Sequence, residues 1–415
     1  MCHMTEPSMS GWTPDRRAWT GLPAAGAWGL LAAALFLAFL AMWVVTPAPV
    51  YALLPFGVAV PELSPLLSAL ALAVAAGAWL GRSRRPARIA AVISLGAAVL
   101  LALPVAQLPA AVRRFDVSMA AAGFGAARLN SVNPTSATAR GSSSVRRGVL
   151  VGDAGGAPLT ADIYARDGVH DAPLLVQIYG GAWQRGRPGD DEVFARYFAA
   201  RGYVVAAIDY RHAPASRWPA QIDDVRTALA WLGVHGPEFG ADPTRLALVG
   251  RSAGAQLALV AAYQAGAPAV AGVVSFYGPV FLADGWREPP RPDPLDTRSI
   301  LETYLGGTPD QVPDRYAAAS PVTYLSAQSP PTLLVYGRRD HIVEVRFARR
   351  LEARLREIGV PAVLIEIPWA EHAFDLLPHG LSARVAFTYT ERFLAGLPAL
   401  HADARPVADA RPRPR

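Results

Sequence analysis

The sequence predicts an α/β domain with a mostly parallel sheet and helices on both faces, preceded by about three transmembrane helices. Three observations support this fold class. Uncharged apolar runs crowd into the first 112 residues, strand-like apolar runs alternate with helical patterns between residues 147 and 398, and a Gly-flanked serine follows one of those runs. Continuous apolar strands that alternate with helices are typical of a parallel sheet covered on both faces.

Composition excludes several classes of protein. Hydrophobic residues make up 52% of the 415 residues and charged residues only 17%, against a usual ~25% charged, which excludes a disordered chain or a coiled coil. Cys2 is the single cysteine, so an intrachain disulfide, an iron–sulfur cluster and a Cys-rich zinc site are excluded. The net charge is +6 and every basic residue is an arginine. These arginines are dispersed rather than clustered, so we expect no nucleic-acid partner.

Three apolar runs predict a membrane domain over residues 1–112, with spans near 24–45, 63–80 and 89–112. A helix of the first run's length covers about 33 Å, enough for a ~30 Å hydrocarbon core. Arginines precede the first run and fill the short loop between the second and third, whereas residues 46–62 carry none. The positive-inside rule therefore predicts a cell-membrane protein with everything beyond about residue 113 outside the cytoplasm. Whether the first run is cleaved as a signal peptide stays open.

The remaining chain divides by composition. Residues 113–146 read as a juxtamembrane segment, with a short amphipathic helix on the membrane surface followed by a flexible linker. Residues 399–415 read as a disordered Pro/Arg-rich tail. Between them, we expect strands at 174–179, 203–209, 246–249, 270–276, 332–336 and 362–367, and helices at 191–201, 219–235, 254–265, 345–358 and 381–394. Ligands bind at the carboxyl ends of such strands.

A nucleophile motif follows the predicted strand at 246–249. Gly250-Arg251-Ser252-Ala253-Gly254 is a G-x-S-x-G sequence between a strand and a helix, the context that the motif requires. A sharp turn there exposes the serine hydroxyl, and the flanking glycines let strand and helix approach closely. Ser252 is therefore the candidate nucleophile.

A base and an orienting carboxylate follow in the order that this arrangement needs, serine, then acid, then histidine. Asp340 comes after the strand at 332–336, and His372 comes after the strand at 362–367. His341 and His379 are rival bases, and the alternative role of Asp340 is a helix N-cap. No metal-binding spacing is present, so we expect neither a metal nor a cofactor.

An oxyanion hole is predicted where the strand at 174–179 ends in Gly180-Gly181-Ala182-Trp183. Small residues there leave backbone N–H groups free to face a developing negative charge. The N–H of Ala253, next to the nucleophile, would supply a further donor.

From about residue 147 to 398 the chain resembles the α/β-hydrolase superfamily, in particular the esterase/lipase branch with hormone-sensitive-lipase-like and acetyl- or feruloyl-esterase-like proteins. The resemblance covers roughly 60% of the chain, and the motifs that carry it are, in order, Tyr179–Trp183, Asp209–Pro214, the Ser252 turn, Ala319–Val322, Gly337–Val343 and Glu371–Phe374. It implies catalysis by Ser252, Asp340 and His372 with Gly181, Ala182 and Ala253 as oxyanion donors. Tyr179 stands where the branch has histidine, Ala215 stands where it commonly has glutamate, and the membrane domain is not part of its common pattern.

The resemblance implies a serine carboxylesterase or deacylase that acts through an acyl-enzyme and needs no cofactor, and the predicted spans make it membrane-anchored. In this fold residues 281–325 can hold a cap. Trp183 with Phe281, and also Trp286, would narrow the acyl pocket and favour short acyl groups; the alternative is that these aromatic residues only pack the cap against the sheet. An acyl ester and the lipid bilayer are then the expected partners. Two alternatives stay open at this point: an acyltransferase that uses the same acyl-enzyme, and a non-catalytic, surface-tethered binding domain.

Overall fold

The computed structural model describes residues 23–125, 143–156, 158–264 and 269–401. The chain divides into two compact units. The first contains residues 1–42 and 66–101, and the second contains residues 43–65 and 102–415. The predicted tail beyond residue 401 and the linker over 126–142 lie outside the described residues.

The first unit consists of apolar helices: α1 (Ala24–Met42), most of α3 (Ser64–Leu80) and the first half of α4 (Arg85–Ala121). Small side chains lie where these helices meet, namely Ala34, Ala78, Ala90 and Ala91, whereas large apolar side chains such as those of Trp28 and Val92 point outward. That pattern suits helices surrounded by lipid. Of the described helices, α1 and α4 are long and apolar enough to cross a membrane. Helix α3 reaches that length only together with the preceding helical segment Tyr51–Glu62, from which it is bent by 82°.

The second unit is built on an eight-stranded sheet with the order β1-β2-β4-β3-β5-β6-β7-β8. Its strands are β1 (Ser143–Asp153), β2 (Pro158–Arg166), β3 (Ala172–Ile178), β4 (Val204–Ile208), β5 (Ala241–Arg251), β6 (Val270–Phe276), β7 (Thr332–Gly337) and β8 (Ala362–Ile367). The β1–β2 and β2–β4 pairs are antiparallel, and every other pair is parallel. The predicted mostly parallel α/β fold is therefore confirmed.

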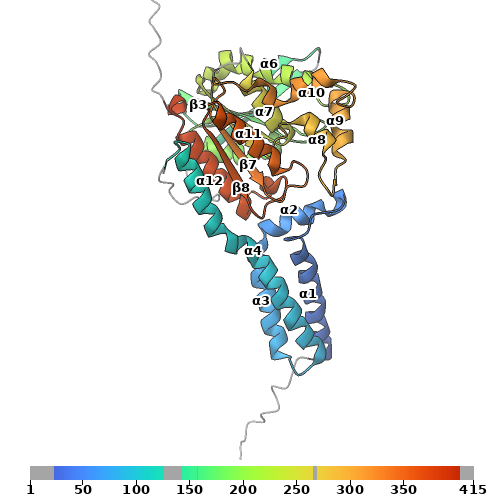
Figure 1. The fold of residues 1–415 in the computed structure, drawn as a ribbon. Coiled ribbons are helices and arrows are strands. Elements are labelled where there is room, and N and C mark those ends of the chain that lie inside the picture. Colours follow the sequence, from blue (N-terminus) through green and yellow to red (C-terminus); the bar gives the residue numbers. More distant parts are fainter. Residues whose placement is uncertain (1–22, 126–142, 157, 265–268, 402–415) are drawn as a thin grey trace, which may run out of the picture. The chain divides into compact units, whose positions relative to one another are not determined.

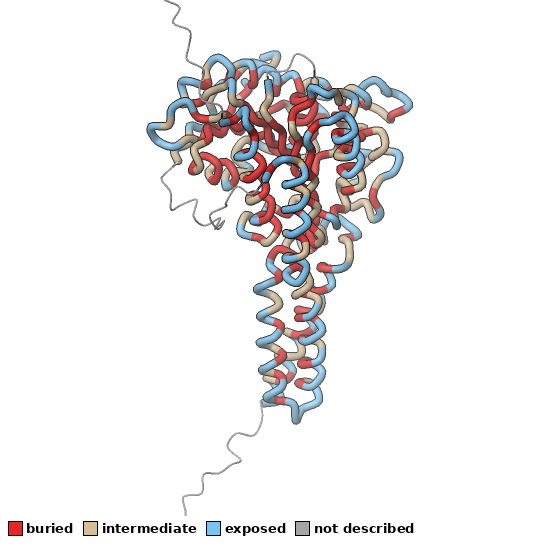
Figure 2. The backbone as a smooth tube through the Cα atoms, turned by 60° about the vertical axis from the view of Figure 1, so that its left-hand side comes forward, coloured by how far each residue is buried: buried red, intermediate tan, exposed pale blue. Residues whose placement is uncertain are grey.

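Helices cover both faces of this sheet (Figure 1). They are α5 (Glu192–Ala199), α6 (Ala220–His235), α7 (Ala253–Tyr263), α11 (Val345–Glu357), α12 (Leu381–Ala395) and the short α13 (Pro398–His401). Buried residues concentrate on the strands and on the inner sides of these helices (Figure 2). Three short helices follow β6 in the region predicted as a cap: α8 (Leu282–Arg287), α9 (Thr297–Leu305) and α10 (Pro313–Ala319).

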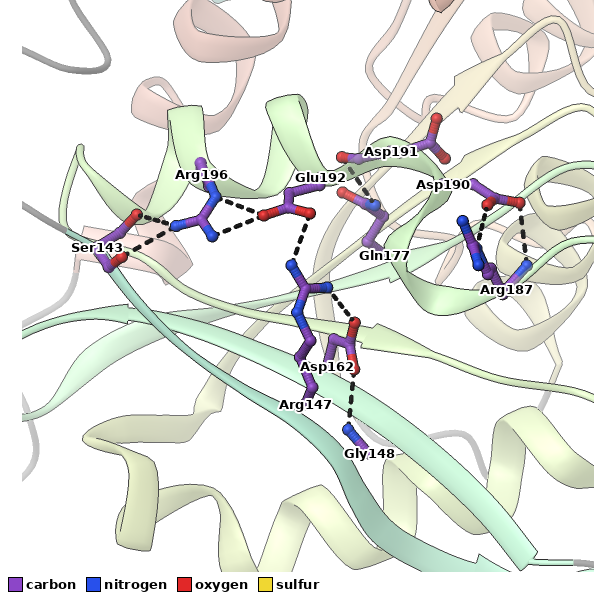
Figure 3. A network of polar contacts seen from close by, with 10 residues as sticks. All are labelled: Ser143, Arg147, Gly148, Asp162, Gln177, Arg187, Asp190, Asp191, Glu192 and Arg196. Carbon is purple, nitrogen blue, oxygen red and sulfur yellow. Dashed lines mark hydrogen bonds and ion pairs between the residues drawn. The ribbon is translucent and has the colours of Figure 1, made fainter.

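Strands β1 and β2 were missed by the sequence prediction because they lack a continuous apolar run. Nearly all of β1 is partly or fully exposed, and polar side-chain contacts add to the packing of its few apolar residues, such as Val151. Arg147 pairs with Asp162 of β2 at 3.0 Å and with Glu192 of α5 at 2.8 Å. Arg196 extends this network from Glu192 to the Ser143 carbonyl (Figure 3). The edge strand is thereby joined to the helix that covers its neighbour.

The segment just after residue 112 is not a membrane-surface helix in the structure. Helix α4 continues to Ala121, and this end packs on α12. Phe115 lies edge-on to Tyr389 at 5.4 Å, and Asp116 accepts hydrogen bonds from Tyr389 and Arg392. Phe115 is 3% exposed. Its burial in the core of the second unit explains why the amphipathic face covers protein instead of lipid.

Residues 46–62, predicted as a simple loop between two spans, also belong to the second unit. They contain a 3-10 helix, η1 (Tyr51–Leu53), and the helix α2 (Leu54–Glu62). Pro55 occupies the first turn of α2, where a proline removes no helical hydrogen bond. The buried side of α2 comprises Gly57, Val58, Val60, Pro61 and Glu62.

Candidate active site

Ser252 lies at a strained turn between β5 and α7. Its backbone has φ 51° and ψ −119°, a conformation that is costly for any residue with a side chain. A Cβ on Gly250 would lie 2.3 Å from the Gly254 carbonyl oxygen, and a Cβ on Gly254 would lie 2.2 Å from the Tyr179 carbonyl oxygen. Only glycines therefore fit on either side of the serine, as the sequence motif predicts.

The structure brings the three predicted catalytic residues together. Ser252 Oγ lies 3.0 Å from His372 Nε2, and His372 Nδ1 lies 2.8 Å from Asp340 Oδ2. His372 follows β8, and Asp340 follows β7, the neighbouring strand. The second oxygen of Asp340 accepts the backbone N–H groups of Ile342 and Val343. With both carboxylate oxygens occupied, Asp340 fixes the orientation of the imidazole toward the serine.

The two rival histidines have other positions. His341 Nδ1 lies 2.6 Å from Glu371 Oε2, and the His341 N–H donates to the other oxygen of Glu371. These two hydrogen-bond contacts hold His341 on Glu371, whereas Asp340 is paired with His372. His379 is exposed in the turn before α12.

The predicted oxyanion donors face the same space as Ser252. Ala182 and Trp183 both have positive φ, at 56° and 58°, because the chain turns sharply as it leaves β3. Within the described parts of the chain, the N–H groups of Gly181, Ala182 and Ala253 donate to no backbone or side-chain acceptor. Ala253 is the first residue of α7, so its N–H also carries the positive end of a helix dipole. Three unpaired donors beside a serine hydroxyl form a suitable oxyanion hole.

Tyr179, which replaces the usual histidine of the motif, braces this turn. Its hydroxyl donates to Asp209 and lies 2.9 Å from His212 Nε2, and its ring stacks on Tyr210. Burial raises the pKa of Tyr179 well above its usual range, so the phenol keeps its proton and remains a donor. Ala215, the second departure from the motif, is exposed.

A buried ionic cluster behind the nucleophile was not found by sequence reasoning. Arg251 is 4% exposed and lies 2.5 Å from Asp375 and 3.3 Å from Asp191. Tyr277 donates to Asp375, and its ring lies 4.5 Å from that of His372. Burial raises the pKa of Asp191 to about 6 even though Arg251 opposes the shift. The cluster links the Ser252 turn to the loop that carries His372.

The serine opens into a cavity of about 680 Å³, a size that suits a drug-sized ligand. Of the three aromatic residues predicted to narrow the acyl pocket, Trp183 and Phe281 line this cavity and Trp286 does not. Trp183 is held by a 2.9 Å hydrogen bond to Gln256 and by stacking on Tyr304 at 4.0 Å. Trp286 instead donates to Glu302 on the cap.

Residues that sequence reasoning missed form a further wall of the cavity. They come from η1 and α2, and they are Tyr51, Ala52, Leu54, Pro55, Val58 and Ala59. In the sequence, their apolar character indicated a membrane domain. No local signal distinguishes an apolar residue that faces lipid from one that lines a cavity. Among the described residues, no group of three or more His, Cys, Asp or Glu side chains could hold a metal ion.

Comparisons with known proteins find a family of esterases to which this chain is similar. The BD-FAE family model matches residues 161–355. The chain is 37% identical to the probable carboxylic ester hydrolase LipM of Mycobacterium tuberculosis over 57% of this chain and 57% of LipM. It is 31% identical to an acetyl-hydrolase of Streptomyces hygroscopicus over 53% of this chain and 75% of that protein. The chain belongs to the esterase branch of the α/β-hydrolase family.

A solved structure of that family shows the same fold. The esterase LipW from Mycobacterium marinum is 25% identical and covers 71% of this chain, with 88% of its own length matched and a TM-score of 0.51. The chain spans only 57% of LipM and 60% of the esterase LipC. The match with LipM thus covers little more than half of this chain and of LipM. Its length is roughly that of the α/β-hydrolase domain.

Proposed function

We propose that this protein is a membrane-anchored serine carboxylesterase that removes short acyl groups through an acyl-enzyme. The observation that carries the proposal is the continuous hydrogen-bond chain from Ser252 through His372 to Asp340, at the floor of a cavity that also holds unpaired backbone donors. The relatives named as ester hydrolases support the same chemistry.

In the first half-reaction, Ser252 Oγ attacks the acyl carbonyl carbon while His372 Nε2 takes its proton. Asp340 stabilises the imidazolium through the Nδ1–H bond, and the developing oxyanion receives hydrogen bonds from the N–H groups of Gly181, Ala182 and Ala253. The intermediate collapses when His372 gives the proton to the departing alcohol. A water then repeats the sequence on the acyl-serine and releases the carboxylic acid.

Short acyl groups, from acetyl to butyryl, fit best beside a tryptophan that cannot move aside. The Trp183 indole is fixed on both its N–H edge and its face, by Gln256 and Tyr304. Phe281 is likewise held, with the guanidinium of Arg350 4.1 Å from its ring centre. The relative named acetyl-hydrolase supports the same preference.

The domain faces away from the cytoplasm in this proposal. Residues 43–65, between the first two apolar helices, belong to the same compact unit as the α/β-hydrolase domain. Because contacts do not form through a bilayer, both lie on one side of the membrane. The arginines between α3 and α4 then mark the cytoplasmic side.

The test is the hydrolysis of p-nitrophenyl esters with acyl chains of two to sixteen carbons by the purified full chain in detergent. We expect the highest kcat/KM at two to four carbons. Ser252→Ala should lower kcat by at least about 10³-fold, whereas Ser326→Ala, a change on a loop away from the cavity, should leave it unchanged. A maximum at twelve carbons or more would contradict the short-acyl pocket, and equal activity of Ser252→Ala would contradict the mechanism.

A further inference from the structure

The wall that η1 and α2 contribute to the cavity is entirely uncharged. Its residues are Tyr51, Ala52, Leu54, Pro55, Val58 and Ala59. The charged residues of the lining come from other elements, for example Arg185 after β3 and Glu288 at the end of α8. One side of the catalytic cavity is therefore suited to a hydrocarbon chain rather than to a polar group.

This wall is fixed to the α/β-hydrolase domain by a buried polar contact. Glu62, the last residue of α2, is 3% exposed, and its Oε2 accepts the backbone N–H of Ser382 at 2.7 Å. Ser382 lies in the first turn of α12, where N–H groups lack helical partners. A Cβ on Gly380 would lie 2.5 Å from the same carboxyl oxygen, so a glycine is needed for this close approach.

Helix α2, which carries most of the wall, packs against the 3-10 helix that follows the catalytic histidine. Gly57 of α2 faces Glu371, the residue just before His372, closely enough that an added Cβ would lie 4.0 Å from Glu371 Cγ. Leu376, which follows His372 on the 3-10 helix η6 (Phe374–Leu376), lines the same cavity and is 70% exposed. Tyr51 is 54% exposed on the η1 side. Apolar surface at the cavity rim is thus exposed. Such exposure is unfavourable in water and favourable in contact with lipid.

Covalent connection keeps this rim close to the membrane. Leu63 alone separates α2 from α3, the predicted second span. Five residues lie between Val58 and Ser64, so the two Cα atoms are at most about 20 Å apart even in an extended chain. The apolar wall therefore lies no farther than this from the point at which the chain enters the bilayer.

From these observations we infer that η1 and α2 form the binding wall for the hydrocarbon chain of an amphiphilic ester that resides in the membrane. The short acyl ester of that substrate reaches Ser252 while its long apolar alcohol lies along Leu54 and Val58. This inference rests on the proposed esterase function and specifies its substrate class. It also gives the membrane domain a role in substrate selection beyond anchoring.

The experiment compares three acetyl esters with the full chain in phosphatidylcholine vesicles: hexadecyl acetate in the bilayer, and glycerol triacetate and p-nitrophenyl acetate in solution. Val58→Trp narrows the cavity at the wall, and Leu54→Asn makes the wall polar at a less buried position. We expect each variant to lower the ratio of kcat/KM for hexadecyl acetate to that for p-nitrophenyl acetate by at least tenfold. Leu63→Trp, a similar change at a residue that is 40% exposed and outside the cavity, should keep the wild-type ratio.

The outcomes separate the inference from the function beneath it. Labelling of Ser252 by a fluorophosphonate in each variant shows that the active site has formed, so a fallen ratio reflects binding of the chain. The membrane-ester inference is overturned if the wild type has a higher kcat/KM for glycerol triacetate than for hexadecyl acetate. It is also overturned if Val58→Trp and Leu54→Asn change kcat/KM equally for all three esters. In both cases the proposed esterase function is retained. If the wild type hydrolyses none of the three, the proposed function itself has failed.

Discussion

Replacing Glu62 with glutamine should make the attachment of α2 insensitive to pH. Burial raises the pKa of Glu62 from 4.5 to about 8, against the hydrogen bonds from Ser382, and the charge of Asp375 raises it further. Asp375 is itself paired with Arg251. At neutral pH the Glu62 carboxyl is therefore protonated in the folded protein, and its carbonyl oxygen still accepts the Ser382 N–H. Glutamine keeps this acceptor and cannot ionise.

The sign of the effect follows from proton binding. Below pH 4.5 Glu62 is neutral in both states and contributes no pH dependence. Between 4.5 and about 8 the folded protein keeps a proton that the unfolded chain releases, so stability falls as pH rises, by up to about 1.4 kcal/mol for each pH unit. From pH 5 to pH 8 the loss is about 3 kcal/mol, or roughly 6–12 °C in Tm for a domain of this size.

The assay is thermal unfolding of wild type and Glu62→Gln in detergent at pH 5, 6, 7 and 8. The Tm of Glu62→Gln minus that of the wild type should increase as pH rises, because only the wild type loses the stability linked to Glu62. Every other titrating group is common to both proteins. Glu357→Gln, at the end of α11 and exposed, serves as the matched control and should follow the wild-type curve. Parallel Tm curves for wild type and Glu62→Gln would refute a buried, protonated Glu62.

Three further predictions concern the site and the topology. His372→Ala should abolish ester hydrolysis, whereas His379→Ala should keep it. The reverse result in an activity assay would show that the assignment of His372 as the base is wrong. Arg251→Met should lower the free energy of unfolding by about 3–5 kcal/mol, because it leaves Asp375 buried without its cation; an unchanged denaturation midpoint would show that the cluster carries no stability. A reporter that is active only after export should be active when fused at residue 142 and inactive when fused at residue 84, and the opposite pattern would invert the proposed orientation.

The sequence predicted the parts of the site that depend on local order along the chain. Ser252, Asp340 and His372 each follow an apolar strand, and parallel strands place their carboxyl ends along one edge of the sheet. Six of the eight strands were visible because they are buried on both faces and read as continuous apolar runs. The exposed β1 gives no such signal, since polar contacts such as that of Arg147 with Glu192 help to hold it.

What could not be predicted depends on contacts between distant parts of the chain. Glu62 meets Ser382 across 320 residues, and no local pattern marks either residue as a partner of the other. Leu54 and Val58 read as membrane residues because lipid and an apolar substrate favour the same side chains. Arg251 and Asp375, 124 residues apart, form an ion pair that only the folded sheet brings together.

The most direct test of the central claim is labelling of the full chain by a fluorophosphonate, followed by intact-mass measurement and peptide mapping. This probe reacts only with a serine whose hydroxyl is activated by a neighbouring base. We expect one adduct per chain on Ser252 in the wild type, and no adduct in Ser252→Ala or in His372→Ala. A folded wild-type protein that takes up no label, or that takes it up on a different serine, would contradict the account.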